Sequence, residues 1–157
     1  MIEVEKKFLL TKEQEKNLIN GAEFITEKVF TDTYYDTVDF SLTSKDKWLR
    51  SRAGKWELKV SLDRTPGREA DIYDEIEDEN KIKEYLGLSG EDMEEALRKN
   101  GYFKFCTCKT TRKKYKNGDY GIDIDYVDYG DFNYQLAEIE LMAKDQNEVK
   151  YALKKNN

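Results

Sequence analysis

The chain has 157 residues, 27 of them basic and 33 acidic, so its formal net charge is −6. This length predicts a single domain over residues 1–157, and the acidic balance argues against a nucleic-acid partner, which would need a basic surface. Histidine is absent and only two cysteines occur. A structural zinc site and histidine-dependent catalysis are therefore excluded, and any chemistry must use carboxylates, Lys, Arg, Tyr or a metal ion.

No apolar run approaches the roughly 20 residues that span a bilayer, and no signal-peptide pattern occurs at Met1. We therefore expect a soluble cytoplasmic monomer that does not bind membranes. The two cysteines, Cys106 and Cys108, are two residues apart on a predicted strand. Same-face neighbours on a strand lie about 6.5–7 Å apart, beyond easy disulfide reach, so both are predicted to be free thiols.

The first predicted strand covers residues 1–10 and alternates charged with apolar side chains. A strand places every second side chain on the same face, so Glu3, Glu5 and Lys7 share one face and apolar residues the other. A short helix is predicted next, over residues 12–20. This charged face is either a solvated outer face or part of a polar interior that holds metal ions and phosphate.

The rest of the chain is mainly β. Further strands are predicted at residues 22–37, 47–53, 55–62, 70–77, 102–116, 120–126 and 135–142. Gly54 and the Asn117-Gly118 turn predict tight hairpins. Helices are predicted at 80–86, 91–100 and 148–155.

Charged side chains recur as same-sign pairs at a spacing of two. The pairs are Glu3/Glu5, Arg50/Arg52, Asp123/Asp125 and Glu138/Glu140. One interpretation is a solvated outer face, which antiparallel strands normally have. However, same-sign neighbours repel unless a counter-ion lies between them, carboxylates on separate strands are ligands for hard cations, and Arg and Lys bind phosphates. The pattern thus favours a polar interior that holds a metal ion and a polyphosphate.

The sequence resembles the CYTH superfamily, the triphosphate tunnel metalloenzymes. The opening Glu3-x-Glu5-x-Lys7 matches the ExExK signature of that superfamily. Further matches follow in family order: Asp32 to Thr37 (DTYYDT), Trp48 to Arg52 (WLRSR), Trp56 to Lys59 (WELK), Tyr73-x-Glu75, Arg112, Asp123-x-Asp125 and Glu138-x-Glu140. Within the superfamily, the IEVEKKF opening, the DTYYDT stretch and Trp48 are most similar to the thiamine triphosphatase group.

The resemblance implies an α+β fold, mainly antiparallel β, in which a β-barrel encloses a hydrophilic tunnel and helices flank it. Members of the family continue beyond the helix that begins near Glu148 with a strand that supplies another phosphate-binding lysine and closes the barrel. This sequence ends at Asn157. It is therefore expected to be truncated at its C-terminus or to form an open-sided tunnel.

The resemblance also implies roles for site residues, and we take them over by motif position. The acids that would bind Mg²⁺ or Mn²⁺ are Glu3, Glu5, Asp123, Asp125, Glu138 and Glu140. The substrate-binding residues would be Lys7, Trp48, Arg50, Arg52, Lys59 and Arg112, and the catalytic residues Lys7, Lys59, Arg52 and Glu140. Glu75 matches a further tunnel acid.

Two aromatic positions have more than one interpretation. Trp48 matches a position associated with thiamine recognition, where an indole stacks on the cationic thiazolium or the pyrimidine, but it also fits a core or barrel-rim aromatic. Tyr34 and Tyr35 are interpreted as core residues.

The implied function is divalent-metal-dependent hydrolysis of thiamine triphosphate to thiamine diphosphate and phosphate. An inorganic triphosphatase that acts on tripolyphosphate is the alternative enzyme, with an adenylyl cyclase behind it. A module that binds polyphosphate or nucleotide without turnover is the non-enzymatic alternative. Each of these takes a small-molecule triphosphate or polyphosphate.

Overall fold

The computed structural model describes residues 1–90 and 92–154. Its strands are β1 (Ile2–Phe8), β2 (Glu23–Thr37), β3 (Lys47–Arg52), β4 (Lys55–Ser61), β5 (Asp71–Ile76), β6 (Tyr102–Asn117), β7 (Tyr120–Asp128) and β8 (Asn133–Ala143). Its helices are α1 (Lys12–Ile19), the 3₁₀ turn η1 (Thr43–Lys45), α2 (Glu79–Leu86), α3 (Met93–Lys99) and α4 (Gln146–Lys154). These elements confirm the predicted α+β, mainly antiparallel fold.

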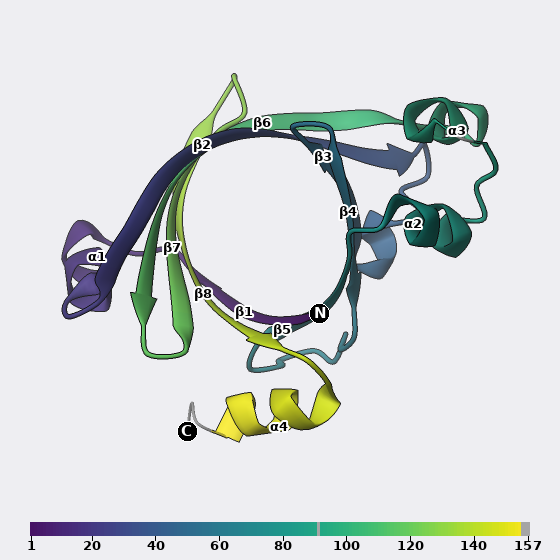
Figure 1. Ribbon diagram of the computed structural model, residues 1–157. Helices are drawn as coiled ribbons and strands as arrows, with labels where there is room; N and C mark the ends of the chain where they lie inside the picture. Colours follow the sequence, from purple (N-terminus) through teal and green to yellow (C-terminus); the bar gives the residue numbers. More distant parts are fainter. Residues whose placement is uncertain (91, 155–157) are drawn as a thin grey trace.

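The eight strands form one closed ring in the order β1-β5-β4-β3-β2-β6-β7-β8 (Figure 1). The ring is uneven, because β2 pairs with β6 from Glu23 to Thr37 whereas β1 pairs with β5 only from Ile2 to Glu5. The helices all lie outside the ring (Figure 1). In the described part of the chain, no helix has the length and apolar character needed to cross a membrane.

The ring closes without the additional strand that the family resemblance implies. β1 pairs with β8 along its whole length, from the pair Ile2 and Ala143 to the pair Phe8 and Ala137. The 11-residue β8 therefore pairs with β7 on one side and with β1 on the other. The expectation of an open side is wrong for this ring, since the edges of β1 and β8 satisfy each other.

Most predicted boundaries agree with the structure to within a few residues. The predicted helix 91–100 corresponds to α3 and the predicted helix 148–155 to α4, which begins two residues earlier than expected. Residues 91 and 155 lie outside the described part. The capping box at the start of α1 is present, because Thr11 Oγ1 accepts from the Gln14 backbone N–H at 3.2 Å and the Gln14 side chain accepts from the Thr11 N–H.

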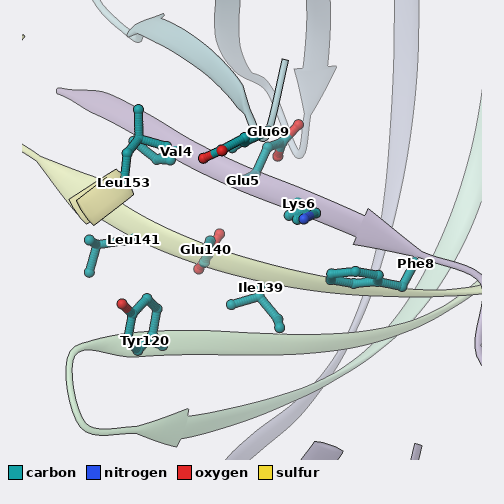
Figure 2. Close-up of a pocket in the computed structure, with 11 residues that line it drawn as sticks. Val4, Glu5, Lys6, Phe8, Glu69, Tyr120, Ile139, Glu140, Leu141 and Leu153 are labelled. Carbon is teal, nitrogen blue, oxygen red and sulfur yellow. The ribbon is translucent and has the colours of Figure 1, made fainter. Parts of the chain in front are cut away.

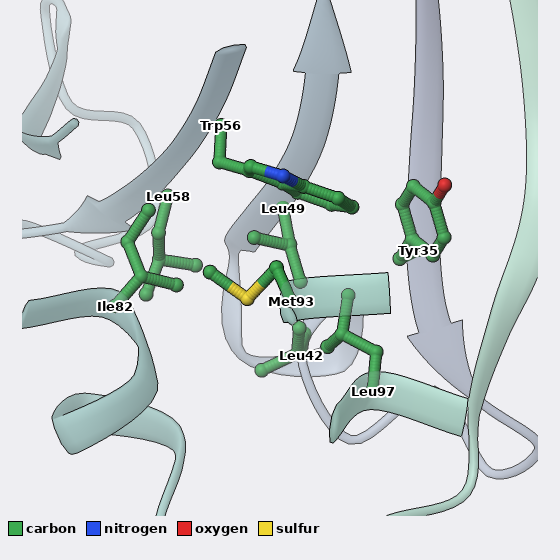
Figure 3. Packing of buried hydrophobic residues seen from close by; sticks show 8 residues of the cluster. All are labelled: Tyr35, Leu42, Leu49, Trp56, Leu58, Ile82, Met93 and Leu97. Atoms are coloured by element: carbon green, nitrogen blue, oxygen red, sulfur yellow. The ribbon is translucent and has the colours of Figure 1, made fainter. Parts of the chain in front are cut away.

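The apolar faces of the strands point outward and are covered by the helices. The largest buried cluster, which we call the α2–α3 core, lies between β2 to β4 and helices α2 and α3 (Figure 3). It consists of Tyr35, Leu42, Leu49, Trp56, Leu58, Ile82, Met93 and Leu97. Smaller clusters form under α4, with Val4, Ile72, Ala143 and Val149, and under α1, with Ile122, Ile124 and Ala137. Since apolar packing occupies the outside, the inside of the ring is left to polar side chains.

Candidate active site

One cavity of about 190 Å³ is lined by residues from all eight strands, so it lies inside the ring. Its walls include acids and bases from opposite sides of the sheet. Several acids facing the interior are buried, each with at most 8% of its surface exposed: Glu3, Glu5, Asp32, Glu57, Asp123, Asp125 and Glu138. The charged faces of the strands are therefore not solvated outer faces.

The two arginines of β3 are held by acids on the neighbouring strands. Arg52 donates two parallel hydrogen bonds to Asp32, at 2.6 Å from Nε and 2.8 Å from Nη2. Arg50 lies 2.8 Å from Glu57 and 3.7 Å from Asp32. Bidentate pairing fixes the plane of a guanidinium as well as its position, so Arg52 is oriented before any ligand enters, and Arg50 is held by Glu57.

Arg112 is held in the same way on β6. It donates to both oxygens of Asp125, at 2.8 and 2.7 Å, and lies 3.0 Å from Asp123. Lys114 lies 2.8 Å from Asp123 as well. Asp123 and Asp125 thus serve as counter-ions of basic groups in this arrangement.

The Phe30 ring lies against two of these arginines, Arg52 and Arg112. Its ring centre lies 3.8 Å from the guanidinium carbon of Arg52 and 5.2 Å from that of Arg112. Guanidinium groups stack favourably on aromatic faces. The ring therefore holds the two cations on the same side of the cavity.

The two lysines of the ExExK and WELK motifs contact the acids of β1. Lys59 Nζ lies 2.7 Å from Glu3, 3.7 Å from Glu5 and 3.5 Å from Glu75. Lys7 Nζ lies 2.7 Å from Glu5. Burial opposes the charge of Lys59, but the nearby Glu5 and Glu3 carboxylates raise its pKa above the usual value. Both lysines are therefore cationic in the cavity.

Three of the six predicted metal ligands come together. Carboxylate oxygens of Glu3, Glu138 and Glu140 lie within 4.8 Å of one another. Gly121, opposite Glu140 on β7, leaves the necessary room, since a Cβ there would stand 3.0 Å from Glu140 Oε1. We call Glu3, Glu138 and Glu140 the carboxylate trio.

Each member of the trio has a lysine nearby: Lys59 Nζ lies 2.7 Å from Glu3, Lys7 Nζ lies 3.9 Å from Glu138, and Lys114 Nζ lies 3.6 Å from Glu140. Burial and the charge of Glu5 raise the pKa of Glu138 to about 9, and burial together with Asp123 raises the pKa of Glu140. Burial and the hydrogen bond with Glu3 raise the pKa of Glu75 to about 8. Crowded carboxylate oxygens of this kind are the donor set that Mg²⁺ and Mn²⁺ prefer, so the residues present fit a hard divalent ion.

A second cavity of about 290 Å³, which we call the aromatic chamber, adjoins the first. The two share lining residues Lys7, Tyr34, Arg50, Lys59, Tyr129 and Tyr134. The chamber is additionally lined by Trp48, Tyr73 and Phe105 among others. The lumen therefore has a charged section and, adjoining it, an aromatic section.

Trp48 belongs to this chamber and not to the buried core. It is 37% exposed, its Nε1 donates to Asp46 at 2.9 Å, and it meets Tyr34 edge-on at 6.2 Å. Tyr35 is a core residue as predicted, but Tyr34 is not, because alternation along β2 turns it into the lumen. An indole at this position is available to a ligand.

Some residues of the site were missed by sequence reasoning. They are Phe30, Asp32, Glu57, Lys114 and Gly121. The available signal was a spacing of two, which places side chains on the same face of a strand: Glu57 lies two residues from Lys59, and Lys114 two residues from Arg112. Asp32 begins the DTYYDT motif. The cysteines are free, as predicted. Burial raises the pKa of Cys108 to about 11, which keeps it a thiol.

Another groove, of about 370 Å³, lies beside β1 and β8 near α4 (Figure 2). Its lining includes Phe8, Ile139, Leu141 and Leu153 (Figure 2). Phe8, Ile139 and Leu141 alternate with the lumen-facing acids, so they belong to the outer face of the barrel. Glu5 and Glu140 also line this groove, but none of the arginines does, so the lumen is the candidate active site.

Comparisons with known proteins agree with this architecture. The CYTH domain model matches residues 1–157. The thiamine-triphosphatases of Macaca fascicularis and Homo sapiens are 33% and 32% identical to the chain over 175 aligned positions, which cover 99% of this chain and 74% of each relative. The solved structure of the PH1819 protein from Pyrococcus horikoshii OT3 superposes with a TM-score of 0.65 at 22% identity, covering 98% of this chain and 85% of that one. The chain therefore belongs to the CYTH domain family.

Proposed function

We propose that this protein hydrolyses the terminal phosphate of a triphosphate, with thiamine triphosphate as substrate and a divalent metal ion as cofactor. The observation that carries the proposal is the lumen itself, where preoriented cations and a carboxylate trio line one cavity next to an aromatic chamber. The names of the macaque and human relatives support a triphosphate as the substrate.

The cations would bind the phosphate chain. They are Lys7, Arg50, Arg52, Lys59 and Arg112. Each is already held by carboxylates of the ring, so little reorganisation is needed when a phosphate enters. In this arrangement Arg52, Lys7 and Lys59 stabilise negative charge on the terminal phosphoryl group during in-line attack.

The carboxylate trio would hold the metal ion, Mg²⁺ or Mn²⁺. A bound divalent ion supplies positive charge to phosphate oxygens and lowers the pKa of bound water. Glu140, whose pKa is raised by burial and by Asp123, is the group we assign to accept a proton from the attacking water. The contacts of Asp123 and Asp125 with Arg112 support a positioning role for these two acids, and Glu5 positions Lys7.

Phosphate release from thiamine triphosphate, tripolyphosphate and ATP tests the proposal, each with Mg²⁺, with Mn²⁺ and with EDTA. We expect kcat/KM for thiamine triphosphate to exceed the other two by about tenfold or more, since an occupied aromatic chamber adds binding that tripolyphosphate lacks. EDTA should abolish turnover.

Each alternative has its own outcome in this assay. Equal rates on all three substrates would contradict the thiamine assignment, and a preference for tripolyphosphate would indicate an inorganic triphosphatase. Tight binding without phosphate release under either metal would indicate a binding module. Cyclic AMP formed from ATP would indicate a cyclase.

A further inference from the structure

Three aromatic rings stack where β7 connects to β8: Tyr129 and Phe132 lie in the turn, and Tyr134 lies at the start of β8. The ring centres of Tyr129 and Phe132 lie 4.6 Å apart with planes 14° from parallel, and those of Tyr129 and Tyr134 lie 5.8 Å apart at 17°. The Tyr129 backbone N–H donates to the Phe132 carbonyl at 2.9 Å, and Gly130 supplies the positive φ of 92° that the turn requires. The backbone of the turn therefore holds Tyr129 and Phe132 close to each other.

Apolar packing does not account for this stack. Within residues 1–90 and 92–154, Tyr129, Phe132 and Tyr134 belong to none of the three buried apolar clusters. Phe132 is 59% exposed and Tyr134 is 36% exposed. Large rings held in a fixed mutual arrangement outside a core indicate a contact surface.

Two of the three rings face the lumen at the junction of its two cavities. Tyr129 and Tyr134 line both the charged cavity and the aromatic chamber, with hydroxyl oxygens 3.4 Å apart. Trp48 lines the chamber from β3, which is four strands away from β8 around the eight-stranded ring. A flat group in the chamber thus has aromatic walls on opposite sides, while a phosphate chain attached to it reaches the cations.

We propose that Tyr129 and Tyr134 form a specificity-determining wall on which a flat aromatic ring attached to the triphosphate stacks. The inference rests on the function proposed above and adds the residues that select the organic end of the substrate. Tyrosine faces attract cations, so a positively charged heterocycle is favoured over a neutral one. The heterocycles of thiamine and a purine base share the flat-ring chemistry, and the test separates them.

Equilibrium binding tests the wall without depending on turnover. Titration calorimetry in EDTA gives dissociation constants for thiamine triphosphate, ATP and tripolyphosphate. Tyr129→Leu and Tyr134→Leu are each expected to lower the ratio of thiamine triphosphate affinity to tripolyphosphate affinity by about tenfold, the usual size of one lost stacking contact. Tyr129→Phe keeps the ring and should change the ratio less than about twofold.

Phe132→Leu is the matched control, because Phe132 belongs to the stack but not to the lining of either cavity. The inference would be overturned if both Tyr→Leu variants left the affinities for thiamine triphosphate and for ATP unchanged relative to tripolyphosphate, if Phe132→Leu caused an equal loss, or if the wild type showed no preference for ligands that carry a ring. A loss confined to ATP would keep the wall and assign it to a purine. Failure of the hydrolase proposal is recognised separately, as absent phosphate release by the wild type in Mg²⁺.

Discussion

The lumen and the α2–α3 core lie on opposite faces of the same two strands. On β3 and β4, Leu49 and Leu58 are 1% and 0% exposed in the core, whereas the alternating residues Arg50 and Glu57 form an ion pair at 2.8 Å in the lumen. One run of sequence thus builds an apolar surface outward and a charged surface inward. The outer face of the barrel is apolar where the helices cover it, and the inner face is polar.

This contrast between the two faces of the strands indicates that stability and function depend on different parts of the barrel. Burying apolar surface stabilises a fold by about 25 cal/mol per Å², whereas the desolvation of buried ion pairs cancels much of their attraction. Stability should therefore depend mainly on the clusters under the helices. The lumen is arranged for binding charge, and its carboxylate trio is crowded in a way that packing alone does not explain.

The largest effect on folding is expected from Leu97→Ala. Leu97 is 1% exposed in α3, and removing a buried leucine leaves a cavity, so the free energy of unfolding should fall by about 3 kcal/mol. Because α3 lies outside the ring (Figure 1), kcat/KM of the folded protein should stay within about twofold of wild type. Chemical denaturation and phosphate release measure the two quantities.

Leu9→Ala is the control for that substitution, since Leu9 is 77% exposed and should change the unfolding free energy by less than about 0.5 kcal/mol. If Leu97→Ala abolishes activity in protein that is still folded, the outer core sets the geometry of the lumen and the comparison between the two regions breaks down.

The reverse pattern is expected from Glu138→Gln in the lumen. The substitution removes a member of the carboxylate trio, so kcat/KM with Mg²⁺ should fall about 100-fold. In EDTA the unfolding free energy should stay the same or rise, because burial and Glu5 raise the pKa of Glu138 to about 9, and the amide is neutral without having to take up a proton on folding. Glu27→Gln, an exposed and outward-facing position on β2, is the control. Unchanged turnover together with marked destabilisation would identify the charges as structural.

The alternation of side chains along each strand predicted much of the candidate site. Spacing of two placed Glu138 and Glu140 on one face with no knowledge of the ring. The same-sign pairs favoured an inward orientation of that face, and the family resemblance agreed with it. The partners depend on register between strands, such as Arg112 opposite Asp125, which neither strand specifies alone. Closure of β8 on β1 is likewise a long-range pairing, and for that reason the sequence did not decide whether the ring closes.

Asp36 is a buried charged residue that stabilises the fold. It is 0% exposed and accepts from the backbone N–H groups of Thr37, Leu42 and Thr43 at 2.7, 3.0 and 2.9 Å, which holds the connection from β2 through η1. Burial opposes its ionisation, but the backbone donors of Thr43 and Leu42 lower its pKa below the usual 3.8. Asp36→Asn should therefore reduce the unfolding free energy by about 1.5–2 kcal/mol at pH 7.

The pH dependence of that loss separates charge from shape. A carboxylate with a lowered folded-state pKa contributes its full stabilisation above the unfolded value of 3.8, and the contribution disappears as pH falls through the folded-state pKa. Wild type and Asp36→Asn are denatured at pH 7, 5 and 3, which lie well above, about one unit above and about one unit below the unfolded-state pKa. The difference in unfolding free energy between the two proteins should be the same at pH 7 and pH 5 and smaller at pH 3. A difference that persists undiminished at low pH would mean that the amide, by pointing N–H against N–H, disrupts the connection sterically and that the charge of Asp36 contributes little.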